Sequence, residues 1–467
     1  MLRHRGRSIF IILSCVVLAY GCATSPVPKE SAVSTPVSDT PPVAKRIDHQ
    51  TEVHGQSRVD PYHWMREKEN PETIAYLEAE NAYTSSKMAH TEELQKSLYD
   101  EILGRIEETD LSVPVRHGDY FYYTRTEEGK DYPIHCRKLE SLDAVEEILL
   151  DQNALAEGHE YFSVGDFEVS DDHRMLAYSI DTRGDERYTL YFKNLETGEL
   201  KPDAIENTGG VAWANDHETV FYTTLDDAHR PDKVFRHRLG TATEEDVLIL
   251  HEEDDAFYAG VNKTRSGRFL LLSLYTISST EVRYLDADNP TGEFEIIAER
   301  RPKVEYSVEH HGDHFLIVTN EEATNFKLMR APVENPQPEH WEEMIAHRPD
   351  VMLRSITAFK DWFVISEREA GVPRARVRHL ESGDEHYVEF PEEVYHMRGA
   401  NNPEFDTQDF RLSYSSLVTP QTIFDYQLET RKLELMKETE VKNYDRTRFE
   451  TSRLYATAAD GTRIPIS

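Results

Sequence analysis

The sequence predicts an all-β protein built as a seven-bladed β-propeller and preceded by a short helical segment. Three observations lead to this fold class. One strand-rich unit recurs seven times across residues 112–436, helical periodicity is confined to residues 70–106, and 38% hydrophobic with 30% charged residues is the composition of a soluble globular chain. At 467 residues the chain is long enough for a large repeat domain that needs no disulfide staples.

Each recurring unit has a turn with Asp, Gly or Ser, a short aromatic or aliphatic strand, a polar loop and a second strand. The turns recur every 44 to 53 residues, and their anchors are Asp119, Asp172, Asp216, Ser266, Asp313, Lys360 and Asp409. A four-stranded blade takes about 40 to 50 residues, and because one blade cannot bury both faces, such blades close radially into a ring. The alternative, two β-sandwiches, requires no constant period.

The first 22 residues read as a secretory signal. Arg3, Arg5 and Arg7 precede an apolar run over residues 8–20, which is short for a membrane span of about 20 apolar residues. The junction at residues 18–22 (LAYGC) resembles a bacterial lipoprotein cleavage box, which predicts lipidation of Cys22 and a periplasmic or outer-membrane-anchored lipoprotein of the bacterial cell envelope. Ordinary cleavage after Ala23 is the alternative.

A tether and a helical segment follow the signal. Residues 23–45 are rich in Pro, Ser, Thr and Val without an apolar period, which predicts a disordered tether. Residues 46–111 form the helical N-terminal segment. Asn70-Pro71 predicts one helix that continues through Tyr83, and Thr91 is expected to cap a second helix with apolar residues every four positions.

Charge and cysteine content exclude several classes of protein. Asp+Glu 87 against Lys+Arg 52 gives a net charge of −35, which makes a nucleic-acid partner unfavourable and attracts cationic peptides. Three cysteines exclude a disulfide framework. If Cys22 is lipidated and Cys15 leaves with the signal, Cys136 is the one remaining thiol, and we expect it to be an inert packed residue. The four tryptophans are expected to be packing residues.

No catalytic or metal-binding motif is visible. The chain has no Gly-x-Ser-x-Gly elbow, and the nearest match, Gly55-Gln56-Ser57, continues as Arg58-Val59. His-Glu-x-x-His and the glycine-rich phosphate loops are also absent. Residues 310–314 (HHGDH) form the densest ligand-like cluster, but their place at the inter-blade turn that opens a repeat favours a solvated loop over a metal site. The acidic run 252–255 lacks the pattern of a calcium loop. We therefore predict no cofactor, no metal and no catalytic residue in this chain.

Several stretches resemble one enzyme family. Residues 60–66 (DPYHWMR) and 76–83 (YLEAENAY) are similar to the N-terminus of the prolyl oligopeptidase family. Five further stretches look like its oligopeptidase B branch: 101–106 (EILGRI), 110–114 (DLSVP), 122–134 (YYTRTEEGKDYPI), 184–188 (GDERY) and 414–420 (YSSLVTP). The resemblance runs from about residue 45 to the end of the chain.

The resemblance implies a seven-bladed propeller that caps an α/β-hydrolase domain. Residues 437–467 would then be the start of a truncated hydrolase domain, with its first hairpin in residues 453–467. The serine, aspartate and histidine of the family lie beyond this point, so no catalytic residue can be placed here. The implied function is that of an exported serine oligopeptidase that hydrolyses short peptides after Arg or Lys, with the propeller gating access. The expected partners are short basic peptides, the chain's own hydrolase domain and, through a lipid anchor, a membrane.

Two alternatives stay open. The chain could instead be a non-catalytic, lipid-anchored propeller that binds peptides or a protein partner. Arg183, Asp185 and Glu186 lie in a polar loop between two strands, where they either complete a structural hairpin or form salt bridges from the propeller to the hydrolase domain.

Overall fold

The computed structural model describes residues 40–467, in two compact units that divide between Glu101 and Ile102. Each unit is described by itself. Lipidation of Cys22, the signal at residues 1–22 and residues 23–39 of the predicted tether lie outside the described residues. Within residues 40–467, no helix has the length and apolar character needed to cross a membrane.

The first unit begins with a β-hairpin that the sequence analysis did not predict. Strand β1 (His49–Val53) pairs antiparallel with β2 (Gln56–Asp60) around His54 and Gly55. Both turn residues have positive φ, 53° and 73°, as a two-residue hairpin turn with the twist of its strands requires. These two segments lack the alternation of apolar and polar side chains that marks a strand in a sequence, and all ten strand residues are exposed.

The predicted helices follow the hairpin. A 3-10 turn η1 (His63–Arg66) leads to α1 (Pro71–Met88), where the Asn70 side chain accepts a hydrogen bond from the Glu72 N–H at 2.9 Å. Proline fits the first helical position because its missing N–H would have no partner there. After η2 (Ala89–Thr91) comes α2 (Glu92–Leu103), which ends before Ile106. The predicted cap at Thr91 is not observed, because Thr91 belongs to η2 and its hydroxyl donates back to the Met88 carbonyl at 2.7 Å.

The second unit is an all-β propeller, and five of its sheets are four-stranded antiparallel blades. The first blade has β3 (Val115–His117), β4 (Tyr120–Arg125), β5 (Ile134–Leu139) and β6 (Glu147–Asp151). Two more contain β14 (Tyr258–Lys263), β15 (Phe269–Tyr275), β16 (Thr280–Asp286) and β17 (Glu295–Ala298), then β18 (Tyr306–His311), β19 (His314–Thr319), β20 (Lys327–Pro332) and β21 (Glu342–Ile345). The last two contain β22 (Val351–Ala358), β23 (Trp362–Glu369), β24 (Val372–His379) and β25 (Glu385–Tyr387), then β26 (His396–Gly399), β27 (Asp409–Ser415), β28 (Thr422–Gln427) and β29 (Lys432–Glu438).

A single seven-stranded sheet lies between the first and second of these blades in the chain. Its strands are β7 (Ser163–Val169), β8 (Met175–Asp181), β9 (Tyr188–Asn194), β10 (Leu200–Trp213), β11 (Thr219–Leu225), β12 (Pro231–Arg238) and β13 (Val247–His251). The remaining short elements are α3 (Gln152–Ala156), η3 (Thr243–Glu245), η4 (Pro338–His340), η5 (Arg446–Arg448), β30 (Leu454–Thr457) and β31 (Arg463–Ile466).

The core consists of layers between neighbouring sheets. Phe359, Trp362 and Val364 of one blade, for example, pack with Phe410 and Leu412 of the next. Central strands such as β15 and β19 are therefore buried on both faces, which explains their uninterrupted aliphatic runs. Trp213 and Trp362 are buried in these layers, as expected.

The prediction of seven blades is wrong, because the structure has five four-stranded blades. The two repeats that begin at Asp172 and Asp216 do not form separate sheets. Strand β10 is 14 residues long, so its first half pairs with β9 and its second half with β11. Thr208 is paired with both Tyr188 and Thr224, which joins the strands of the two repeats into one ladder.

The predicted hydrolase hairpin is also wrong. Strands β30 and β31 pair only with each other, and all their residues are exposed. No described strand extends them into the sheet of an α/β-hydrolase domain.

Candidate functional site

The polar loop between β8 and β9 is built around a buried carboxylate. Asp181 Oδ1 accepts hydrogen bonds from the N–H groups of Arg183 and Gly184 at 2.8 and 3.0 Å, and Oδ2 accepts one from Glu186 N–H at 2.9 Å. Burial by itself would raise the pKa of Asp181, but these donors hold its pKa below the ordinary value. The buried Asp181 carboxylate therefore holds the backbone of this loop in place through three hydrogen bonds.

The three predicted interdomain residues stand on the exposed side of this loop. Arg183 Nη2 lies 3.1 Å from Asp185 Oδ2, so these two side chains pair with each other. Glu186 has φ of 59°, a left-handed conformation that is unusual for a residue with a side chain, and its carboxylate is exposed. Their role as contacts to a second domain stays a prediction. The loop thus presents the Glu186 carboxylate to solvent from a turn that is fixed by hydrogen bonds to Asp181.

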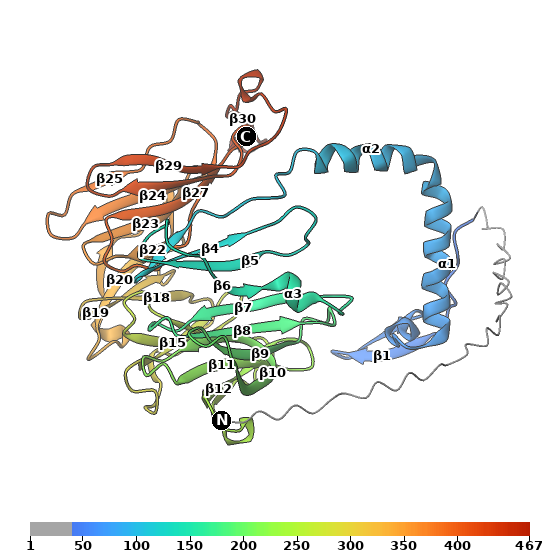
Figure 1. Ribbon diagram of the computed structural model, residues 1–467, viewed down its shortest axis with the longest axis horizontal. Coiled ribbons are helices and arrows are strands. Elements are labelled where there is room, and N and C mark those ends of the chain that lie inside the picture. The colour runs from blue at the N-terminus through green and yellow to red at the C-terminus, as the bar shows by residue number, and fades with distance from the viewer. Residues whose placement is uncertain (1–39) are drawn as a thin grey trace, which may run out of the picture. The chain divides into compact units, whose positions relative to one another are not determined.

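A second region lies where the first blade meets the last, and we refer to the contacts between residues 107–126 and 401–442 as the closing seam. The sheets follow one another in chain order until β4 and β5 come beside β27 and β29 (Figure 1). The first and last blades share no backbone ladder, since β3–β6 and β26–β29 are separate sheets. The seam is held by side chains instead.

Five polar contacts span the closing seam, one of them from Lys437 Nζ to the Leu111 carbonyl. Lys437 Nζ lies 2.6 Å from both carboxylate oxygens of Asp110. Arg411 Nη1 donates to the Pro114 carbonyl at 2.7 Å. The other two contacts are an ion pair of Lys442 with Glu107 at 3.0 Å and a hydrogen bond from Gly118 N–H to Glu404 Oε1 at 2.6 Å. Burial tends to raise the pKa of Asp110, yet Lys437 and the Leu111 N–H hold it below the usual range.

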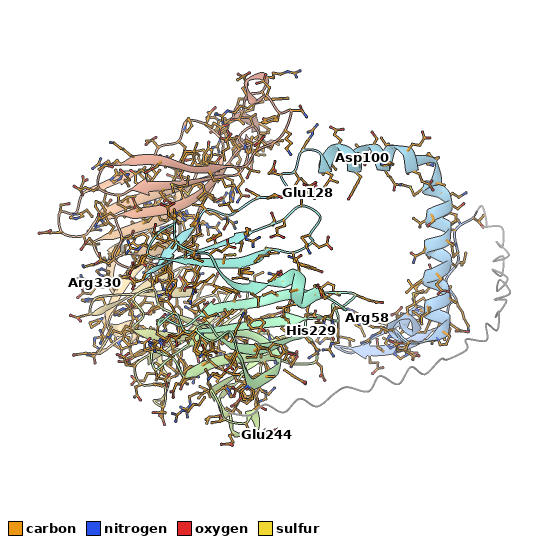
Figure 2. All side chains as sticks on the ribbon, viewed as in Figure 1. Arg58, Asp100, Glu128, His229, Glu244 and Arg330 are labelled. Atoms are coloured by element: carbon orange, nitrogen blue, oxygen red, sulfur yellow. The ribbon has the colours of Figure 1, made fainter. Side chains whose placement is uncertain are left out.

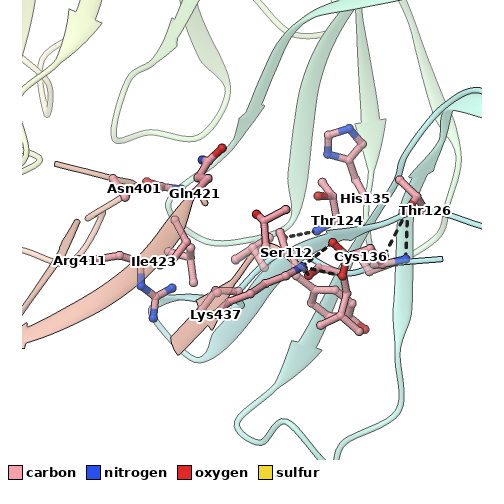
Figure 3. Close-up of a pocket in the computed structure, with 18 of the residues that line it drawn as sticks. Ser112, Thr124, Thr126, His135, Cys136, Asn401, Arg411, Gln421, Ile423 and Lys437 are labelled. Atoms are coloured by element: carbon pink, nitrogen blue, oxygen red, sulfur yellow. Dashed lines mark hydrogen bonds and ion pairs between the residues drawn. The ribbon is translucent and has the colours of Figure 1, made fainter. Parts of the chain in front are cut away.

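A cavity of about 580 Å³ lies at the seam (Figure 3). Its wall is largely apolar, with Tyr122, Leu149 and Ile423 among the lining residues, and Lys437 contributes a charge. His135 lines it as well, stacked on Phe167 with 4.2 Å between ring centroids, and burial lowers the pKa of His135. The cavity can accept a small, mostly apolar group.

The nucleophilic groups of this cavity are not activated. Cys136 is buried, and burial together with Glu146 raises the pKa of its thiol to about 11. Because the thiolate is the reactive form, Cys136 is inert at neutral pH, as the sequence predicted. The Ser112 hydroxyl accepts a hydrogen bond from the Thr124 N–H at 2.9 Å, and no histidine in residues 40–467 is paired with it.

A serine–histidine contact elsewhere also lacks catalytic geometry. Ser266 Oγ lies 2.7 Å from His310 Nδ1, but His310 is buried and its Nε2 has no partner. A triad needs a carboxylate on the second nitrogen to orient the ring and stabilise its charge. Burial lowers the pKa of His310 to about 4, which makes it a poor general base at neutral pH.

The prediction of a solvated inter-blade loop at residues 310–314 is wrong for His310, which is buried, and the segment is the hairpin between β18 and β19 of one blade. The histidines of this hairpin have different partners. His311 Nε2 lies 2.9 Å from the Lys360 carbonyl, while His310 faces Ser266. Within residues 40–467, no group of three or more His, Cys, Asp or Glu side chains is placed to hold a metal ion.

Sequence reasoning missed the residues of the closing seam. Asp110 and Lys437 are 327 positions apart, and neither belongs to a motif that marks a pair. The available signal was the repeat itself, because a closed ring must bring its first and last units together.

Comparisons with known proteins agree with the propeller fold. Residues 41–439 match the family model of the prolyl oligopeptidase N-terminal β-propeller domain. The chain therefore belongs to the prolyl oligopeptidase family, and the matched part is its propeller domain.

Individual relatives cover nearly the whole chain. Dipeptidyl aminopeptidase BI of Pseudoxanthomonas mexicana is 40% identical over 93% of this chain and 64% of its own length, and protease 2 of Moraxella lacunata is 35% identical over 91% and 62%. The solved structure of oligopeptidase B from Leishmania major is 31% identical with a TM-score of 0.85, covering 92% of this chain and 64% of that one. The chain thus spans less than two thirds of the length of these relatives.

Proposed function

We propose that this chain is the propeller part of an exported serine oligopeptidase that hydrolyses short peptides after Arg or Lys. In this proposal the propeller gates access to a catalytic domain outside the chain. The observation that carries it is the match of residues 41–439 to the propeller of a peptidase family whose relatives are substantially longer. The described residues contribute a scaffold without an assembled nucleophile, which fits that division of labour.

Exposed apolar side chains on α2 support a covering domain. Leu94, Leu98 and Ile102 repeat every four residues on α2 and are 58%, 49% and 61% exposed. A helix with such a stripe ordinarily buries it against another element. Burial against a catalytic domain would explain why the stripe is apolar.

The closing seam supports gating. Its joining contacts are polar side-chain pairs, several of them exposed, with no backbone ladder between the two sheets. Such contacts are weak and screened by salt, so this junction can open at lower cost than a shared sheet.

The charge supports a preference for basic peptides. A net charge of −35 attracts cationic substrates over long distances and increases their rate of association. The signal-like N-terminus supports export to the cell envelope, with Cys22 as the proposed lipid site.

The direct test compares the 467-residue chain with the full-length gene product. Each is assayed on an arginyl chromogenic peptide with a blocked N-terminus and on an arginyl dipeptide substrate with a free one. The proposal expects hydrolysis of the blocked peptide by the longer protein alone. Activity only on the free dipeptide would favour an aminopeptidase, as the name of one relative suggests. Absence of any hydrolase sequence downstream would favour the non-catalytic binding module instead.

The loop between β8 and β9 provides a second test. If Glu186 contacts the catalytic domain, Glu186→Arg in the full-length gene product should lower kcat/KM about tenfold, which corresponds to about 1.4 kcal/mol. The matched control is Glu199→Arg, an exposed residue beyond the opposite end of β9. Equal activity of the two variants would contradict the interdomain role.

A further inference from the structure

A second cavity, of about 440 Å³, lies near the axis of the propeller. Its lining includes Arg265 from the turn between β14 and β15, Arg354 on β22 and Arg398 on β26. These residues come from three blades, and the blade β18–β21 packs between the first two of them. Blades that are not neighbours meet only where their first strands converge, so the cavity belongs to the central tunnel.

The lining of this cavity is strongly basic. Five arginines contribute to it: Arg265, Arg354, Arg368, Arg374 and Arg398. Its one carboxylate, Glu367, is already neutralised, because Arg376 Nε donates to it at 3.0 Å and Arg348 also pairs with it. A concentration of arginine in a chain with a net charge of −35 calls for a specific explanation.

Two of these arginines have no structural role that the contacts reveal. Arg354 and Arg398 are exposed to the cavity and form no hydrogen bond or ion pair with any described residue. Arg368 donates only to the Gly371 carbonyl, at 3.1 Å. By contrast, Arg374 pairs with Glu369 at 3.1 Å, and Arg265 lies 5.5 Å from the ring centre of Phe359.

We propose that Arg354 and Arg398, with Arg368, bind the C-terminal carboxylate of a peptide inside the tunnel. The guanidinium fork matches a carboxylate with two parallel hydrogen bonds, and unpaired arginines in a concave site have most to gain from such a ligand. A cavity of this volume takes a small ligand or a peptide end. Because the whole chain is acidic, it repels polyanions but admits a basic peptide that carries one terminal carboxylate.

This inference rests on the proposed function and deepens it. The basic side chain of the substrate would be read by the catalytic domain, while the tunnel would hold the opposite end. The site would thereby favour short peptides whose C-terminus reaches the arginines.

The test is a calorimetric titration of the 467-residue chain at low salt. The probes are acetyl-Ala-Ser-Ala-Ser as the free acid, the same peptide as its amide, acetyl-Asp-Ala-Ser-Ala amide, and inorganic phosphate. None contains Arg or Lys, so hydrolysis after a basic residue does not interfere. The free acid should bind at least tenfold more tightly than the amide, and Arg354→Gln and Arg398→Gln should each remove that preference.

The matched control is Arg330→Gln, an arginine of β20 that Figure 2 labels at the outer side of the sheets and that pairs with Glu342 at 2.8 Å. It should keep the preference. Arg354→Lys retains the positive charge but lacks the two parallel donors of a guanidinium, so it should keep only part of the preference for the free acid. Melting temperatures show whether each variant is folded.

Three results would overturn the inference: equal binding of acid and amide, equal binding of the internal aspartate peptide, or phosphate binding as tight as the acid. The titration is independent of catalysis. A full-length gene product that hydrolyses peptides but shows no carboxylate preference defeats this inference alone, whereas one that hydrolyses no peptide defeats the proposed function.

Discussion

Two junctions of the propeller join neighbouring repeats by different means. In the seven-stranded sheet, β10 is one strand whose backbone pairing passes from β9 to β11 at Thr208, with a register shift on each side of that residue. At the closing seam, the first and last blades meet through Lys437–Asp110, Arg411–Pro114 and similar side-chain contacts. A backbone ladder depends little on side-chain chemistry, whereas ion pairs depend on charge, salt and pH. The seam is therefore the junction that solution conditions can loosen.

The largest effect is expected from interrupting the strand pairing at Thr208, where β10 passes from β9 to β11. Thr208 is 1% exposed and is paired with strands on both sides. Proline has no backbone N–H and its ring is poorly tolerated within a paired strand, so Thr208→Pro should lower the free energy of unfolding by about 3 kcal/mol or more. Urea denaturation measures the loss. Thr208→Val keeps the backbone and should cost about 1 kcal/mol, so equal effects of the two substitutions would argue against the ladder as the joining element.

Removing the best-buried cation of the seam should have a smaller and more local effect. Arg411 binds both oxygens of Asp425 at 2.7 and 2.8 Å, and the two side chains are 15% and 17% exposed. Arg411→Met leaves that carboxylate unpaired and should cost about 2 to 3 kcal/mol. Hydrogen exchange should accelerate first in β3 and β27.

The control for this variant is Arg330→Met, whose partner Glu342 is largely exposed. It should cost less than about 1 kcal/mol. If exchange accelerated uniformly over all sheets in Arg411→Met, the seam would not be a separate point of opening.

The partly exposed ion pair of Lys437 with Asp110 should contribute still less to the free energy of unfolding. A double-mutant cycle with Lys437→Met and Asp110→Asn should give a coupling energy below about 1 kcal/mol, since both groups contact solvent. The coupling should shrink at high salt because mobile ions screen the pair. A coupling that does not respond to salt would contradict this description of the seam.

The smallest effect concerns pH. The folded pKa of Asp110 lies below its unfolded value, so the stabilisation that this group provides is present above about pH 4 and is lost as pH falls through the folded pKa. The difference in unfolding free energy between the wild type and Asp110→Asn should therefore decline below about pH 4. A constant difference down to acid pH would show that the Asp110 carboxylate does not stabilise the fold.

Local features of the structure could be predicted wherever a short sequence determines them. The cap of α1 at Asn70-Pro71 and the packed state of Cys136 are confirmed. Both depend on neighbours in the chain or on a hydrophobic side chain within a strand. The hairpin β1–β2 was missed because its exposed strands carry no apolar alternation.

Features that depend on distant partners could not be predicted. The repeat pattern predicted two separate units at Asp172 and Asp216. It did not predict that residues 200–208 would extend β10 and join the two units in one sheet. The candidate site divides in the same way. The loop with Arg183, Asp185 and Glu186 was found from its local pattern, whereas the seam pairs and the tunnel arginines were not, because each joins segments from different blades.

The sequence by itself determined that this is an all-β repeat protein of the prolyl oligopeptidase family, since strand periodicity and family motifs are local properties of the chain. Only the tertiary structure decided how many separate blades form, which residues close the ring and where unpaired charge gathers. The physical reason is that sheet pairing and electrostatics depend on distances in space, which closure of the ring sets between residues hundreds of positions apart.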